Sequence, residues 1–247
     1  MIGITRRYLV RFGRTPQLVF FGTVQPVLFL VGLSVVFRGL VEARLGGHYI
    51  QYLLPGVLIM NVILFAGTTG VGLAEDLQAG VIDRFRSLPM ARSAVLVGRT
   101  VADLARNAAS MTVIVVVGLA MGFHLHASVA AALVAVLLAL FFGYATSWVF
   151  AAVGLAVKDP QTAQFIGFAP VLPLVYLSGA WIPVAAMASG VQTFARNQPV
   201  NVTIEAVRTL VEGTHAYHWI WQSLAWSGGL LGVFGLLAVR LYRRAAS

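Results

Sequence analysis

The sequence predicts an all-helical membrane protein with six transmembrane helices. Of its 247 residues, 59% are hydrophobic and 10% are charged, whereas about a quarter of the residues in an ordinary soluble domain carry a charge. A soluble domain of this length cannot cover so much apolar surface. A helix that crosses the hydrocarbon core needs about 20 mostly apolar residues, and six such runs lie at 18–37, 52–73, 101–123, within 128–157, at 163–182 and at 220–241.

The six runs differ in the polar and helix-breaking residues that they contain. The first, second and fourth runs carry no charge. The third is charged only near its start, at Asp103 and Arg106, which are spaced to pair with each other on a helix. The fifth contains Pro170 and Pro173, and the sixth carries Arg240 at its exit.

The distribution of basic residues predicts the orientation of these helices. Six crossings place both termini on one side of the membrane. Thirteen of the 17 Lys and Arg residues lie on that side, and the other four are Arg38, Arg44, Arg196 and Arg208. Cytoplasmic segments are enriched in Lys and Arg, so both termini are expected in the cytoplasm. The net charge of +9 is then a topology signal, and no nucleic-acid partner is expected.

The residue content gives no support for several kinds of site. The chain has no cysteine, which excludes disulfides and thiolate-based sites. The histidines match no metal motif, the acidic residues have no neighbouring nucleophile and His, and no G-x-x-x-x-G-K-[ST] phosphate-binding loop is present. We therefore expect a single transmembrane domain over residues 1–247, with no nucleotide-binding domain, catalytic residue, metal site or cofactor in this chain.

The segment before the first run is predicted to lie along the membrane surface. Ile4, Tyr8 and Phe12 recur every fourth residue, and the arginines of this segment fall on another face of the same helix. Such a pattern is typical of an amphipathic helix at the headgroups of the membrane lipid.

The loop between the second and third runs carries a short amphipathic helix of its own. Val81, Ile82, Phe85 and Leu88 form its apolar face, and polar residues including Asp83 and Arg84 cover the other face. Gly80 and Pro89 bound it. This helix is suited to docking into a groove on another protein; the alternative is a short helix that lies on the lipid.

The external segment 183–219 is also expected to be helical. Asn201 is a candidate N-cap for a helix that runs to Glu212 and stops at Gly213. Elsewhere, two pairs of glycines spaced four residues apart permit close helix approach and are predicted to pack within the bundle. These pairs are Gly118 with Gly122 and Gly228 with Gly232.

Two groups of residues carry a family resemblance. In the loop after the second run, the chain has Glu75, Gly80, Asp83, Arg84, Pro89 and Arg92 in this order. Near the C-terminus, it has Ser178-Gly179, Ile182-Pro183, Asn197-Gln198-Pro199 and Arg208. Both patterns resemble the type-2 ATP-binding-cassette (ABC) membrane permeases, a bacterial exporter class that includes daunorubicin-resistance transporters. The resemblance covers nearly the whole chain.

The resemblance implies that the loop helix is a coupling helix seated on a separate ABC ATPase subunit. That partner would bind ATP and Mg²⁺, and a second permease chain, identical or different, would complete the membrane part in the bacterial inner (cell) membrane. The residues expected to couple this chain to the ATPase are Glu75, Gly80, Val81, Asp83, Arg84, Phe85, Leu88, Pro89 and Arg92.

The resemblance also implies where the cargo passes. The family has external re-entrant helices between spans five and six; the alternative is an ordinary helix resting on the outer leaflet. Its path runs between spans two and five of the two halves, so the expected lining residues are Asn61, Phe65, Tyr176 and Ser178. An apolar path with few polar groups suits an amphipathic drug or a lipid-like cargo.

Three other functions remain open on the sequence. The first is export of a polysaccharide or glycoconjugate by the same family, and the second is an ion-coupled secondary transporter. A carrier of the second kind usually holds an ionisable residue in the middle of a span, and none is present here. The third is a membrane scaffold that transports nothing, whose cytoplasmic loop would bind no ATPase.

Overall fold

The computed structural model describes residues 24–45, 49–78 and 92–245, and within these ranges the regular structure is helical throughout. The predicted interfacial helix in 1–14 and the predicted coupling helix 81–88 lie outside the described residues. The helices are α3 (Gln25–Leu45), α4 (Tyr49–Gln78), α6 (Arg92–Ala120), α7 (Val129–Val157), α8 (Pro160–Phe168), α9 (Val171–Tyr176), the 3₁₀ turn η2 (Val184–Ala186), α10 (Ser189–Asn197), α11 (Pro199–Glu212) and α12 (His218–Ala245).

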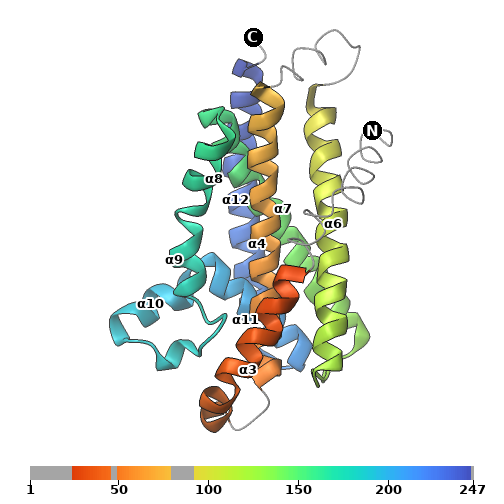
Figure 1. Ribbon diagram of the computed structural model, residues 1–247, viewed down its shortest axis with the longest axis vertical. Helices are drawn as coiled ribbons and strands as arrows, with labels where there is room; N and C mark the ends of the chain where they lie inside the picture. The colour runs from red at the N-terminus through yellow and green to blue at the C-terminus, as the bar shows by residue number, and fades with distance from the viewer. Residues whose placement is uncertain (1–23, 46–48, 79–91, 246–247) are drawn as a thin grey trace.

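The long helices run side by side along the long axis of the molecule (Figure 1). Four described stretches are long and apolar enough to cross a membrane, namely Tyr49–Gln78, Asp103–Ala120, Val129–Val157 and His218–Arg243. α3 adds a shorter apolar stretch, Gln25–Gly39. An all-helical protein with several apolar helices is therefore confirmed, while the total of six crossings stays a prediction.

The predicted fifth span is not one continuous helix. Residues 163–182 fall in α8, which ends at Phe168, and in α9, which begins at Val171. Pro170 precedes α9 as its first flanking residue, and a proline has no N–H with which to continue the hydrogen-bond ladder of α8. The two short helices follow one another along the bundle in Figure 1.

The turn between α7 and α8 is defined by its capping residues. Lys158 ends α7 in the left-handed conformation, with φ of 63°. Asp159 then caps α8, because its carboxylate accepts a hydrogen bond of 2.7 Å from the Thr162 amide, and Pro160 takes the first helical position, where a proline is favoured. Hydrogen bonds from the hydroxyl and amide of Thr162 lower the pKa of Asp159.

α4 is the central helix of the bundle and α12 a peripheral one. Of the most apolar 18-residue window in each helix, 78% is buried in α4 and 11% in α12. α4 and α7 approach most closely at glycines, because a Cβ added to Gly154 would overlap the carbonyl oxygen of Gly70. Such contact of two helix backbones requires small residues on both sides.

The glycine pairs predicted to pack within the bundle do so at one position only. Gly118 faces the side chain of Leu54 on α4. A Cβ added to Gly122, Gly228 or Gly232 would meet no atom within 4 Å, so the prediction is wrong for these three. Four-residue spacing on a helix makes close approach possible but does not decide which helix comes near, and here α4 meets α7 through Gly70 and Gly154 instead.

The connections alternate between the two ends of the molecule. The end of α4, the start of α6 and the end of α12 lie at the top of Figure 1, whereas α10, α11 and the turn between α6 and α7 lie at the bottom. This is the order that consecutive crossings produce. The face turned to the cytoplasm remains a prediction from the basic residues, which assigns it to the upper end.

Candidate functional site

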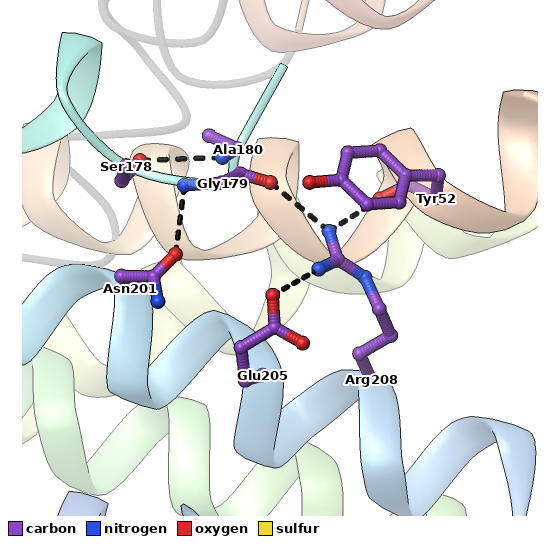
Figure 2. A network of polar contacts seen from close by, with 7 residues as sticks. All are labelled: Tyr52, Ser178, Gly179, Ala180, Asn201, Glu205 and Arg208. Carbon is purple, nitrogen blue, oxygen red and sulfur yellow. Dashed lines mark hydrogen bonds and ion pairs between the residues drawn. The ribbon is translucent and has the colours of Figure 1, made fainter. Parts of the chain in front are cut away.

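Helix α11 presents one polar face at the lower end of the bundle. Asn201, Glu205 and Arg208 are four and three residues apart, so they share this face. The Arg208 side chain is buried and forms an ion pair with Glu205. Its Nη2 donates hydrogen bonds to the backbone carbonyls of Tyr52 at 2.9 Å and Gly179 at 3.1 Å, as Figure 2 shows.

The same residues connect three segments that are distant in the sequence. The Arg208 guanidinium lies 3.7 Å from the centre of the Tyr52 ring, and the Asn201 Oδ1 accepts a hydrogen bond of 2.7 Å from the Gly179 amide. We call Tyr52, Gly179, Asn201, Glu205 and Arg208 the Arg208 node. It joins the start of α4, the segment after α9 and helix α11.

The electrostatics of the node depend on several partners acting together. Removing an arginine from water costs several kcal/mol unless the charge is paired and hydrogen-bonded. Arg208 has a carboxylate, two carbonyl dipoles and the face of an aromatic ring around it. Guanidinium geometry allows all of these contacts at once, which an ammonium group does not.

Further contacts attach the segment after α9 and helix α11 to the rest of the bundle. The Tyr49 hydroxyl donates to the carbonyl of Trp181 at 2.9 Å, and the Thr203 and Ser223 hydroxyls are 3.0 Å apart. Gly56 faces the backbone of Ala180 so closely that a Cβ would overlap it. Ten of the 14 residues of α11 are buried, so α11 is packed against protein rather than resting apart from it.

The start of α11 differs from the prediction. The helix begins at Pro199, with Gln198 as its N-cap, and Asn201 lies inside it. The Gln198 Oε1 accepts a hydrogen bond of 2.8 Å from the Val200 amide, and its Nε2 donates to the Leu174 carbonyl at 2.9 Å. Pro199 fits the first helical position, so the cap is the residue before it, Gln198, three residues before the predicted Asn201. The Asn201 side chain is therefore free to bind Gly179. The predicted stop at Gly213 is confirmed, with φ of 73°.

A second polar group lies inside the bundle between α4 and α6. Asp103 forms an ion pair with Arg106, as the spacing predicts, and accepts a hydrogen bond of 2.8 Å from the Thr69 hydroxyl. The Ser110 hydroxyl donates to the Asn61 Oδ1 at 3.3 Å. We call these residues together with Asn107 the Asp103 cluster; all but Arg106 are buried.

The predicted path residues do not converge on one surface within a single chain. Asn61 and Phe65 point into the bundle and are buried, and Phe65 lines a cavity of about 10 Å³ beside Thr69. Ser178 is fully buried, and its hydroxyl donates to the Val175 carbonyl at 2.6 Å. Tyr176 is 67% exposed.

The predicted coupling residues are described at their two edges only. Glu75 is exposed near the end of α4, and Arg92 is the first residue of α6. The others, Gly80, Val81, Asp83, Arg84, Phe85, Leu88 and Pro89, lie outside the described residues.

Sequence reasoning left Arg208 out of the candidate site. The sequence indicates Arg208 only as a basic residue outside the predicted spans and as part of the family pattern. The spacing of Glu205 and Arg208 suggests a local ion pair, but the carbonyls of Tyr52 and Gly179 are 156 and 29 residues away along the chain. Contacts of this range leave no local signal.

Comparisons with known proteins agree with this architecture. The chain is 30% identical over 237 residues to the daunorubicin resistance ABC transporter permease protein DrrB1 of Streptomyces coeruleorubidus, covering 96% of this chain and 83% of that protein. It is 22% identical over 243 residues to the probable doxorubicin resistance ABC transporter permease protein DrrC of Mycobacterium tuberculosis, covering 98% and 88% of the two chains. The family model described as ABC-2 type transporter matches residues 2–211. The chain therefore belongs to the ABC-2 type transporter family, as a permease of the kind found among drug-resistance transporters.

Proposed function

We propose that this chain is the membrane subunit of an ATP-driven ABC exporter that moves an amphipathic drug or lipid-like molecule out of the cytoplasm or the inner leaflet. The observation that carries the proposal is the similarity to a daunorubicin resistance permease over 96% of the chain. The apolar helices of the bundle support it. The location is the bacterial inner membrane, with six crossings and both termini in the cytoplasm.

Energy in this proposal comes from a separate ABC ATPase subunit, since the sequence has no phosphate-binding loop. The ATPase docks on the segment between α4 and α6, where the predicted coupling helix lies. Closure of the ATPase pair on ATP displaces this segment and moves the two helices that flank it.

The path of the cargo lies between two permease chains. α8 and α9 expose large apolar side chains, with Phe165 at 70%, Leu172 at 55% and Tyr176 at 67%. In a dimer this surface meets the second chain, and Tyr176 lines one wall. The buried residues Ser178, Asn61 and Phe65 reach the path only once α9 and α4 move. The exposed apolar surface suits a cargo with aromatic or acyl parts.

The Arg208 node closes the outer end of this path. It ties the segment after α9 to the start of α4 through two backbone carbonyls, and the tie must loosen before α9 and α4 can part. In this proposal, α10 and α11 form the re-entrant roof of the family.

One observation favours a second candidate function, an ion-coupled carrier. Asp103 is a buried carboxylate inside the bundle, and buried ionisable residues mark proton or ion sites in many carriers. Its ion pair with Arg106 favours a structural role for this carboxylate instead. An exporter of polysaccharides or glycoconjugates is the alternative within the family.

The test uses proteoliposomes that contain this chain and its co-expressed ATPase. We expect the two proteins to co-purify, and we expect daunorubicin transport that requires ATP and continues when an uncoupler collapses the proton gradient at constant ATP. Transport by this chain alone, driven by a proton gradient without ATP, would establish the carrier function instead. Transport of a lipid-linked oligosaccharide but not of daunorubicin would establish the glycoconjugate alternative.

A further inference from the structure

Helices α4 and α6 extend beyond the thickness of the membrane on the side of the predicted coupling segment. They contain 30 and 29 residues, or about 45 Å each at 1.5 Å per residue, whereas the hydrocarbon core spans about 30 Å, roughly 20 residues. Thr69 is about 20 residues from the lower end of α4 at Tyr49, and Asp103 is nearly as far from the lower end of α6 at Ala120. Both residues therefore lie about one membrane thickness above the lower ends. Beyond them, α4 continues to Gln78 and α6 begins at Arg92, so each helix has an arm of about 15 Å.

Thr69 and Asp103 are bonded to each other where these two arms begin. The Thr69 Oγ1 donates to the Asp103 Oδ2 at 2.8 Å, and both residues are buried. The other carboxylate oxygen of Asp103 pairs with Arg106 one turn further along α6. The carboxylate is thus oriented by its own helix and presents its second oxygen to α4.

The inward face of α6 changes character along its length. Towards the arm it carries Asp103, Asn107 and Ser110, and towards the lower end it carries Met111, Ile114 and Gly118. Apolar contacts are not directional, so they fix the relative orientation of the two helices less specifically than a hydrogen bond does. A hydrogen bond to a charged group is directional and about twice as strong as a neutral one.

The packing between α4 and α6 is interrupted at this level. A cavity of about 10 Å³ lies between α4, α6 and α7, lined in part by Thr69, Asp103 and Asn107. The hydrogen bonds of Thr69 with Asp103 and of Ser110 with Asn61 therefore supply directional cross-links where close packing is incomplete.

We propose that Thr69 and Asp103 form a clamp that makes the arms of α4 and α6 move as one body. Asp103 is then a positioning residue for energy coupling. A displacement of the segment 79–91 reaches the bundle through both helices together, instead of bending one arm away from the other. This inference rests on the proposed function, because it concerns how movement caused by the ATPase enters the membrane.

The experiment uses the complete complex of permease and ATPase in proteoliposomes. Thr69→Val removes the hydroxyl and keeps the shape, and Thr69→Ser restores a hydroxyl. The matched control is Thr112→Val, because the exposed Thr112 hydroxyl donates to the carbonyl of Ala108 in its own helix at 2.9 Å, with no second partner among the described residues. The measured quantity is cargo transported per ATP hydrolysed.

We expect Thr69→Val to assemble normally and hydrolyse ATP while the transport-to-ATP ratio falls about five-fold, as expected for one lost hydrogen bond. Thr69→Ser and Thr112→Val should keep the wild-type ratio. An unchanged ratio in Thr69→Val overturns the clamp while leaving the proposed function intact. Loss of assembly or of folding in Thr69→Val also overturns it, because the bond would then serve stability alone. Absence of ATP-driven transport by the wild-type complex would instead refute the proposed function.

A second measurement follows the arm of α4 relative to α6. Because the chain has no cysteine, spin labels can be attached at Gln78→Cys, an exposed position in the arm of α4, and at Ala105→Cys, an exposed position on α6 two residues from Asp103. In the wild-type background the distance between the labels should be the same with and without a non-hydrolysable ATP analogue. In Thr69→Val it should broaden or shift when the analogue binds. Equal distances in both backgrounds contradict a clamp.

Discussion

Arg208 shows how one buried charge can determine the arrangement of three chain segments. Its contacts reach the start of α4, the segment after α9 and its own helix, so no two of these segments can separate without uncovering a charge. A buried arginine destabilises the fold strongly when one of its partners is removed, because its charge is then left uncompensated. This residue is therefore a better candidate for holding a closed state than any single apolar contact nearby.

Replacing Arg208 should destabilise the protein more than replacing an exposed arginine. Arg208→Ala leaves Glu205 partly buried without its cation, and we expect a loss of about 3 kcal/mol, or roughly 6–12 °C in the midpoint of thermal unfolding. Arg208→Lys should recover little, because an ammonium group cannot reach both carbonyls and stack on Tyr52. The control is Arg196→Ala at an exposed position of α10. Thermal unfolding in nanodiscs is the measurement, and full recovery in Arg208→Lys would contradict a role for the fork geometry.

At the scale of the element, apolar length predicted the helices, but the side-chain pattern did not predict how they end or meet. Runs of 20 or more apolar residues identify α4, α6, α7 and α12 because a bilayer imposes that length. The sequence shows Pro170 but does not predict that the helix breaks there, because prolines are tolerated in membrane helices when neighbours satisfy the freed carbonyls. The meeting of Gly70 with Gly154 depends on a tertiary contact, which the sequence of one helix does not contain. The cap at Gln198 is instead a local contact with Val200, and Pro199 at the first helical position was the local signal for it.

The contact between α4 and α7 can be tested at Gly154. Gly154→Ala places a methyl group against the carbonyl of Gly70, and overpacking of this kind costs about 1–3 kcal/mol. We expect a midpoint of unfolding about 2–12 °C lower. Gly228→Ala on α12 is the control, because its added Cβ meets nothing within 4 Å. An unchanged midpoint for Gly154→Ala would mean that the two helices are not in backbone contact at this position.

For the whole molecule, the proposed mechanism needs two parts: a bundle that can open, and an ATPase partner that drives the opening. In the proposed exporter, the Arg208 node at one end of the bundle would close the outer side, and the Asp103 cluster near the other end would receive the movement from inside. The transmission depends on the segment 79–91, whose assignment rests on its amphipathic sequence and on the family. If this segment does not bind an ATPase, the proposed route by which ATP drives export is wrong.

Phe85→Ala and Arg84→Glu test that binding. If the apolar face of the predicted coupling helix fills a groove on the ATPase, truncating Phe85 removes a buried aromatic contact that is worth about 2 kcal/mol or more at an interface hot spot. This is at least a ~30-fold loss of affinity between the subunits. Arg84→Glu should weaken binding more at low salt than at high salt if acidic groups of the ATPase lie opposite.

Neither change alters an apolar run, so membrane insertion should be preserved, and affinity for the ATPase in nanodiscs at two salt concentrations is the measurement. A helix that lies on the lipid predicts a different result, because both variants would then bind the ATPase as the wild type does. That result would remove the coupling assignment from segment 79–91. The arms of α4 and α6 would then have no identified partner, and ATP-driven export would have to enter the bundle elsewhere.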